Sequence, residues 1–102
     1  DIRRRHNTLV VTYGHIASGN LHAAPVIDMG SASERERVKL VADEVHRLAI
    51  RLGGTVTGEH GVGITRIQYM EQEHGPALST MRLIKQALDP KGIMNPGKMF
   101  PE

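Results

Sequence analysis

The feature that most constrains the fold is a change of periodicity near residue 30. Residues 8–27 start with β-branched and aromatic side chains and carry a Ser-Gly-Asn turn cluster in their middle, a pattern typical of a β-hairpin. Residues 33–52 instead repeat apolar side chains at helical spacing, with charged side chains between them. A hairpin followed by helices predicts an α+β fold.

The hairpin is expected to consist of strands at about residues 8–16 and 20–27. Pro25 has no backbone N–H to donate, so it should lie at a sheet edge or at the end of its strand. The simplest connection is a two-residue turn at Ser18 and Gly19, because both residue types favour turns.

Three helices should follow the hairpin, at about residues 33–52, 62–73 and 76–88. Ser33 and Glu36 have the spacing of a capping box at the start of the first helix. The two glycines at 53 and 54 favour its end, since glycine accepts the left-handed conformation. The C-terminal tail, residues 91–102, should be irregular because it contains two glycines and two prolines. The apolar stripe of the first helix is made of Val38, Val41, Val45, Leu48, Ala49 and Leu52.

The composition limits the chemistry that the chain can carry. It has 102 residues and no cysteine, which excludes disulfides, thiolate zinc sites and cysteine nucleophiles. Any metal ion must therefore be held by His, Asp or Glu. No apolar run reaches the roughly 18 residues of a membrane helix, so we expect no transmembrane segment. A cytoplasmic location, or a peripheral one at the inner membrane, fits these features.

The charge balance argues against a nucleic-acid partner. The net charge is +2, and only 3% of the residues are aromatic. The basic cluster at residues 3–6 is interpreted as a solvated terminal segment rather than a phosphate-binding arm. A basic nucleic-acid module would instead show strongly salt-dependent binding.

The hairpin places two histidines where they can meet. A two-residue turn would set His15 directly opposite His22, with Cβ atoms roughly 4.5 to 5.5 Å apart. Alternation would put Tyr13 and Asn20 on the same polar face, and apolar side chains on the other face. Two imidazoles so placed could hold one metal ion, or they could be a pair of solvated surface histidines. The register decides whether the rings meet.

A second cluster lies in the glycine-rich segment at residues 53–63. Glu59 and His60 are neighbours, so in extended chain they point to opposite sides, and one could bind a metal while the other acts as a base. Two histidines and one carboxylate form a familiar open site for a divalent ion. The alternative is a loop with charged surface residues.

Three segments in fixed order carry a family resemblance. "YGHIASGNLH", "GGTVTGEHGVG" and "IKQALDPKGIMNPGKMF" together resemble the C-terminal region of FAD-linked oxidases of the vanillyl-alcohol oxidase type. Within that family the chain looks most like D-lactate and D-2-hydroxyacid dehydrogenases and the FAD-binding subunit of glycolate oxidase. One departure lies at Ala17 and Ser18, where the family often has Gly-Asp, and it bears on the geometry of the turn.

The resemblance implies a function and a set of site residues. Residues 1–102 would be a single C-terminal fragment, part of a ferredoxin-like substrate (cap) domain with a C-terminal segment, and the FAD pyrophosphate-binding domain would lie upstream. The activity implied is oxidation of a 2-hydroxy acid, of the D-lactate or glycolate type, by hydride transfer to FAD. The residue roles implied are metal ligands for zinc or manganese at His15, His22 and Glu59, a base at His60, and a residue near the flavin ring at Asn95.

Two further expectations concern the fragment itself. Without the upstream domain it should bind FAD weakly or not at all and should not turn over substrate. A truncated sheet leaves an edge uncovered, which favours self-association. The alternative to an enzyme fragment is a free-standing metal-binding or interaction module, built from the same hairpin and helices but without flavin chemistry. An FAD domain upstream in the same reading frame would separate the two.

Overall fold

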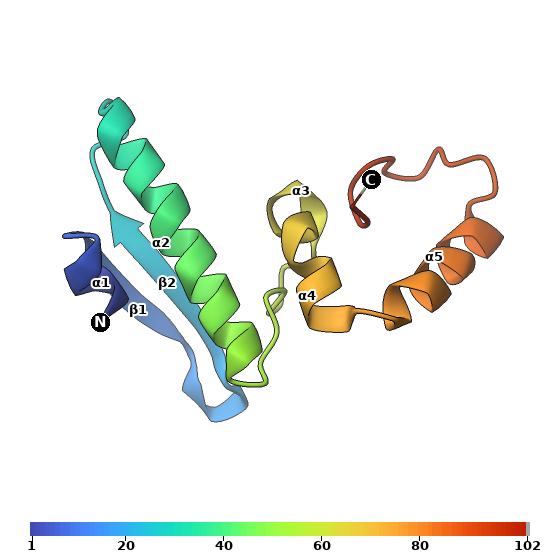
Figure 1. Ribbon diagram of the computed structural model, residues 1–102, viewed down its shortest axis with the longest axis horizontal. Helices are drawn as coiled ribbons and strands as arrows, with labels where there is room; N and C mark the ends of the chain where they lie inside the picture. Colours follow the sequence, from blue (N-terminus) through green and yellow to red (C-terminus); the bar gives the residue numbers. More distant parts are fainter. Residues whose placement is uncertain (102) are drawn as a thin grey trace. The chain divides into compact units, whose positions relative to one another are not determined.

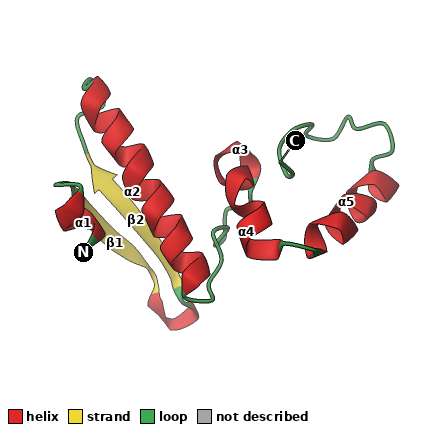
Figure 2. Ribbon diagram, in the orientation of Figure 1, coloured by secondary structure: helices red, strands yellow, loops and turns green. Residues whose placement is uncertain are grey.

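The computed structural model describes residues 1–101 of the chain. Its backbone divides into two compact units, Asp1–Gly54 and Thr55–Glu102. The first is a hairpin with a long helix and the second a set of short helices with a C-terminal loop, which confirms the α+β class (Figure 1, Figure 2). In chain order the elements are α1 (Ile2–Arg5), β1 (Leu9–His15), η1 (Ile16–Ser18), β2 (Asn20–Val26), α2 (Ala32–Arg51), α3 (Gly63–Arg66), η2 (Ile67–Tyr69), α4 (Met70–His74) and α5 (Ala77–Leu88).

The hairpin is present, but its register differs from the predicted one. The strands pair antiparallel with His15 opposite Asn20 and His22 opposite Tyr13, so the expected direct pairing of His15 with His22 is wrong. The cause is the turn, which occupies residues 16–19 as a single 3₁₀ turn rather than two residues. A hydrogen bond from the Ser18 hydroxyl to the His15 carbonyl, 3.0 Å long, helps to close it.

Gly14 is the residue that makes this hairpin geometry possible. Its φ is 142°, and a Cβ built on it would lie 2.3 Å from the Asn20 carbonyl oxygen. We therefore expect Gly14→Ala to destabilise the hairpin unit by more than the roughly 1–3 kcal/mol of a strained backbone conformation. Gly19→Ala is the matched control, because Gly19 has a φ of 71° but open space around a Cβ, and it should cost only about 1–2 kcal/mol. Thermal unfolding followed by circular dichroism checks both variants, and equal losses of stability would contradict the role given to Gly14.

The N-cap of helix α2 is Ser31, two residues before the predicted cap at Ser33. The Ser31 hydroxyl accepts a hydrogen bond from the Glu34 backbone N–H at 3.4 Å, so the predicted capping box of Ser33 and Glu36 is wrong. The Glu34 carboxylate also accepts a bond of 2.6 Å from the Asp28 N–H, which fixes the loop that enters the helix. The helix ends as expected, since the residue after its C-cap is Gly53 with a φ of 79°.

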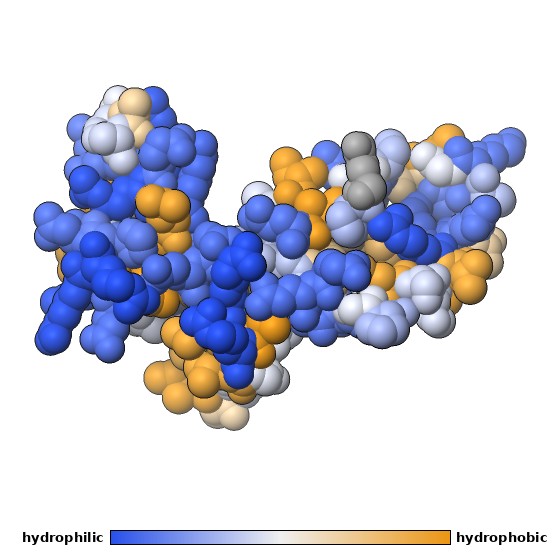
Figure 3. Space-filling model, viewed as in Figure 1, coloured by the Kyte–Doolittle hydropathy of each residue, from blue (hydrophilic) through white to orange (hydrophobic). Residues whose placement is uncertain are grey.

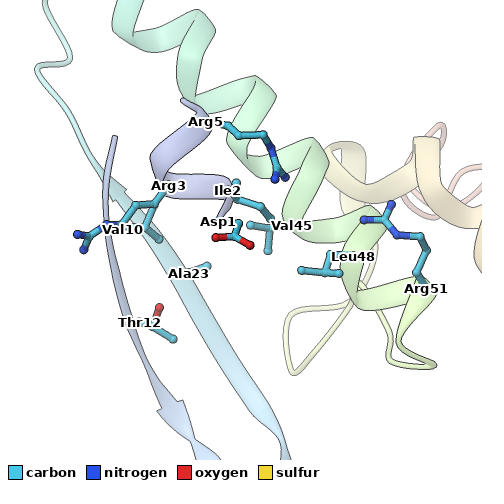
Figure 4. Close-up of a pocket in the computed structure, with 10 residues that line it drawn as sticks. All are labelled: Asp1, Ile2, Arg3, Arg5, Val10, Thr12, Ala23, Val45, Leu48 and Arg51. Atoms are coloured by element: carbon cyan, nitrogen blue, oxygen red, sulfur yellow. The ribbon is translucent and has the colours of Figure 1, made fainter. Parts of the chain in front are cut away.

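One face of the hairpin turns toward α1 and α2. Side chains from both strands and both helices line a cleft of about 580 Å³ (Figure 4). Val41 of α2 is 1% exposed, whereas Leu52 is 77% exposed, so the predicted apolar stripe ends before the C-cap. The hairpin contributes Val10, Thr12 and Ala23 to the lining of this cleft, and α2 contributes Val45 and Leu48.

The arginines at the start of the chain are exposed, as the prediction of a solvated segment requires, but the segment also forms defined structure. It forms the single turn α1, and Arg5 Nη2 lies 2.6 Å from Glu44 Oε2 on α2. The Arg5 hydrogen bond holds the pKa of Glu44 below its ordinary value. Arg5 therefore ties the N-terminal turn to α2 rather than serving as part of a free arginine cluster.

The hairpin exposes apolar surface at its loop end and has no third strand in the described part of the chain. Ile16 is 81% exposed and Leu21 is 56% exposed, and Figure 3 shows apolar surface gathered in this region. Both strands are sheet edges, the condition that favours pairing with another chain. Self-association of the isolated fragment stays a prediction that size-exclusion chromatography with light scattering can check.

The second unit is built on a small core. Its buried hydrophobic residues Val56, Tyr69, Met70 and Leu78 come from a loop and from η2, α4 and α5. The single helix predicted at residues 62–73 is broken into α3, η2 and α4, because the 3₁₀ turn η2 lets consecutive Tyr69 and Met70 both reach the core. The third predicted helix is confirmed as α5. Among the described residues, no helix is long and apolar enough to cross a membrane.

Candidate functional site

The polar face of the hairpin survives the change of register. A shift of two residues keeps the side-chain faces, so Tyr13, His15, Asn20 and His22 still lie on one side of the sheet. His15 and His22 are now diagonal neighbours, which typically lie about 7–8 Å apart and within reach of long side chains. The sequence prediction of one shared face is thus confirmed, and the prediction of direct opposition is not.

The His22 ring is held in place by an aromatic partner. Tyr13 and His22 stack with ring centroids 4.9 Å apart and an angle of 14° between the ring planes. The His22 residue is half-buried, whereas His15 at the strand end is exposed. Stacking limits the rotation of the His22 imidazole, so its nitrogen atoms are presented in a restricted set of directions.

The glycine-rich segment forms a turn rather than the extended chain that the sequence analysis assumed. The His60 N–H donates to the Thr57 carbonyl at 3.0 Å, and Gly58 and Gly61 have φ values of 50° and 73°. As a result Glu59 and His60 do not point apart, since His60 Nε2 lies 3.5 Å from Glu59 Oε1. Both side chains are about half exposed, at 49% and 47% for His60 and Glu59.

An arginine that sequence reasoning missed lies beside His60. Arg66 Nη2 is 3.4 Å from His60 Nδ1, and Arg66 Nη1 is 3.4 Å from the Thr65 hydroxyl. A guanidinium can only donate, so this contact uses the imidazole with its Nδ1 unprotonated. Nothing in the local sequence singles out Arg66, because it is one basic residue in a short amphipathic stretch.

The loop that carries Asn95 is organised by a buried carboxylate. Asp89, only 7% exposed, accepts hydrogen bonds from the backbone N–H groups of Ile93 at 3.0 Å and Met94 at 2.9 Å. Lys85 pairs with the same carboxylate and donates to the Met94 carbonyl at 2.8 Å. Asn95 follows directly with a φ of 48°, a conformation that asparagine tolerates. Sequence reasoning placed Asp89 only just beyond the predicted end of the third helix at residue 88, and its role in the loop was missed.

These contacts make the stability of the loop dependent on pH. The hydrogen bond from Lys85, aided by the Met94 and Ile93 N–H groups, holds the pKa of Asp89 below its ordinary value of 3.8. Because the folded pKa is lowered, the stabilisation is present above that ordinary value and is lost as pH falls through the folded value. We expect Asp89→Asn to lower the thermal midpoint at neutral pH and to speed hydrogen exchange at the Ile93 and Met94 amides. Asp43→Asn, which removes an exposed carboxylate paired with Arg47 at 2.8 Å, is the control and should change little. Unchanged exchange in Asp89→Asn would contradict the role of this carboxylate.

The donor types of His15, His22 and Glu59 fit a divalent ion. Two imidazoles and one carboxylate are a ligand set that suits zinc or manganese, and the Tyr13 stacking holds the His22 ring ready for such a role. The turn that carries Asn95 is held by the hydrogen bonds from the Ile93 and Met94 N–H groups to Asp89. Among the described residues, the fold is thus α+β, and it carries His and Glu side chains of the types that bind a divalent ion.

The comparisons with known proteins agree with this class. Residues 1–99 match the family described as "FAD linked oxidases, C-terminal domain", and the chain belongs to that family. This membership speaks against a free-standing module without flavin chemistry.

Several curated relatives are similar over almost the whole chain. The glycolate oxidase subunit GlcD of Bacillus subtilis is 42% identical over 101 residues, which are 98% of this chain and 22% of the relative. The mitochondrial D-lactate dehydrogenase (cytochrome) of Arabidopsis thaliana is 40% identical over 94 residues, 91% of this chain and 17% of the relative. The D-2-hydroxyglutarate dehydrogenase of Haemophilus influenzae is 38% identical over 96 residues, 93% of this chain and 9% of the relative. The chain therefore spans about a fifth or less of the length of these relatives.

Proposed function

We propose that this chain is the C-terminal part of a flavin-dependent oxidoreductase that converts a 2-hydroxy acid, of the D-lactate or glycolate type, to the 2-oxo acid. The observation that carries the proposal is the family match over residues 1–99. It is supported by relatives whose names specify glycolate, D-lactate and D-2-hydroxyglutarate, all of them 2-hydroxy acids.

His15, His22 and Glu59 would hold a divalent ion, zinc or manganese. When bound, such an ion supplies Lewis acidity that lowers the pKa of the substrate hydroxyl group. The support is the shared hairpin face of the two histidines and the exposed Glu59 carboxylate. His15 at the end of β1 and His22 on β2 present imidazoles from a paired, hydrogen-bonded frame rather than from a loose loop.

His60 would act as the base that accepts the hydroxyl proton. Its two ring nitrogens have distinct neighbours, with Nε2 near Glu59 Oε1 and Nδ1 near Arg66 Nη2. A carboxylate at Nε2–H orients the ring and stabilises the imidazolium that forms, so the proton would be taken at Nδ1. Glu59 can contact both the proposed metal ion and His60, because its carboxylate has two oxygens.

FAD would be bound mainly by a domain upstream of this chain. When bound, it supplies the acceptor for the hydride that leaves the α-carbon of the substrate. Asn95 would pack near the flavin ring, on the turn that Asp89 stabilises. The chain alone would bind FAD weakly or not at all and would not turn over substrate. We also propose a cytoplasmic location, with a peripheral location at the inner membrane as the alternative.

Turnover by the full-length protein tests this proposal. The flavin-loaded enzyme is assayed with D-lactate, glycolate and D-2-hydroxyglutarate and an artificial electron acceptor, and formation of the 2-oxo acid is measured. We expect oxidation of at least one of these acids, and simple alcohols of similar size should be poor substrates. Absence of turnover with every 2-hydroxy acid, in protein shown to contain flavin and metal, would overturn the proposal.

A further inference from the structure

Arg66 is a half-buried cation without an anionic partner in the described part of the chain. Its Nε is buried and has no hydrogen-bond partner among residues 1–101, and its two other contacts are long, 3.4 Å each, to the Thr65 hydroxyl and to His60 Nδ1. No carboxylate of residues 1–101 forms an ion pair with it. Two exposed arginines do have carboxylate partners: Arg5 pairs with Glu44 and Arg47 pairs with Asp43.

A half-buried guanidinium without an anionic partner is energetically unfavourable unless a ligand supplies the anion. Burying a charge is unfavourable unless the charge is paired and hydrogen-bonded. Arginine has a planar fork of N–H donors that matches the two oxygens of a carboxylate, and this pairing is stronger than a neutral hydrogen bond. The Thr65 hydroxyl and the His60 imidazole carry no negative charge and are weak substitutes for an anion, so the guanidinium of Arg66 is available for one.

We propose that Arg66 binds the α-carboxylate of the substrate and is the residue that restricts the enzyme to hydroxy acids. This inference rests on the proposed function, since it takes the substrate to be a 2-hydroxy acid and His60 to accept its hydroxyl proton. In a 2-hydroxy acid the hydroxyl and the carboxylate are on adjacent carbon atoms. A carboxylate-binding group must therefore lie beside the group that takes the proton, as Arg66 Nη2 lies beside His60 Nδ1.

The contact between Arg66 and His60 also explains how substrate binding exposes the base. Without substrate, Arg66 Nη2 donates to the same imidazole nitrogen that has to receive the hydroxyl proton. An incoming carboxylate is a stronger acceptor than a neutral imidazole, so it draws the guanidinium away and leaves Nδ1 to the hydroxyl group. A neutral alcohol cannot compete in this way.

The test compares Arg66→Gln and Arg66→Lys with wild type in the full-length flavin-loaded enzyme. The readouts are kcat and KM for the best 2-hydroxy acid and for its amide, in which the carboxylate is neutral. Binding of the 2-oxo acid product is followed separately through the flavin absorption spectrum. Arg51→Gln is the matched control, because it removes an exposed arginine at the end of α2. Flavin and metal content are measured for every variant.

Arg66→Gln should raise KM for the acid and weaken binding of the 2-oxo acid by about 10- to 100-fold, with a much smaller effect on the amide. Arg66→Lys keeps the charge but lacks the planar fork of N–H donors. Its KM for the acid and its affinity for the 2-oxo acid should therefore lie between those of Arg66→Gln and wild type. If Arg66→Gln loses flavin, the KM and the product binding of Arg66→Lys alone test the proposal. Unchanged KM for the acid, or equal losses for acid and amide, would overturn the role of Arg66. A wild-type enzyme that oxidises no 2-hydroxy acid would overturn the proposed function as well, so the two failures are distinguishable.

Discussion

Replacing His22 by alanine in the full-length protein is expected to remove the metal ion and the oxidation of the 2-hydroxy acid together. His22 is one of three proposed ligands, and loss of an outer-shell partner alone already lowers metal affinity by about 10- to 100-fold. Loss of a ligand should exceed that range. Metal content per flavin, measured by elemental analysis after dialysis, is compared with kcat under the same conditions, and excess zinc or manganese should restore little activity.

A matched variant shows whether the effect is specific to the hairpin. His46 is another half-buried histidine, on α2, and its Nδ1 lies 2.7 Å from the Ala42 carbonyl oxygen. It lies outside the proposed ligand set, so His46→Ala should retain both metal and activity. Full metal content and full activity in His22→Ala would contradict the assignment of His22 as a metal ligand.

Replacing His60 by alanine should separate chemistry from metal binding. A positioned general base contributes about 10²- to 10⁴-fold to a rate, so kcat should fall by a factor in that range. Metal and flavin content should stay at wild-type levels, because the proposed ligands do not include His60. Rapid-mixing measurement of flavin reduction reports the chemical step directly.

The second unit supplies its own control for this variant. His74 also follows a glutamate, and its Nε2 lies 3.6 Å from Glu73 Oε1, much as His60 Nε2 lies near Glu59. His74 is at the C-terminal end of α4, where a cation interacts favourably with the helix. His74→Ala should reduce stability slightly and leave the rate of flavin reduction unchanged. A similar rate loss in both variants, or none in His60→Ala, would contradict the base assignment.

The elements of the fold were predictable because their signals are local. Strand-forming side chains on both sides of a turn identified the hairpin, and helical spacing identified α2 and α5. The register was not predictable, since it depends on a 3₁₀ turn and on the unusual φ of Gly14, neither of which a turn propensity encodes. The error happened to be two residues, so the polar face was still assigned correctly. A one-residue error would have reversed the faces.

For the candidate site, the sequence predicted correctly only which side chains share a face of the hairpin. His15 and His22 could be placed on one face from alternation alone, whereas the contacts of Arg66 and Asp89 needed the structure. Arg66 meets His60 through the turn of the glycine-rich segment, and Asp89 reaches forward to two backbone N–H groups in an irregular loop. Such pairings depend on backbone conformations that a periodic pattern does not specify.

Anaerobic reduction of the flavin by substrate tests the central claim most directly. Full-length protein containing FAD and metal is mixed without oxygen with a 2-hydroxy acid, either unlabelled or carrying deuterium on the α-carbon. The proposed function predicts loss of the visible absorption of oxidised flavin, formation of the 2-oxo acid, and slower reduction with the deuterated acid, since the α-hydrogen leaves as hydride. Flavin that stays oxidised with D-lactate, glycolate and D-2-hydroxyglutarate alike would contradict it.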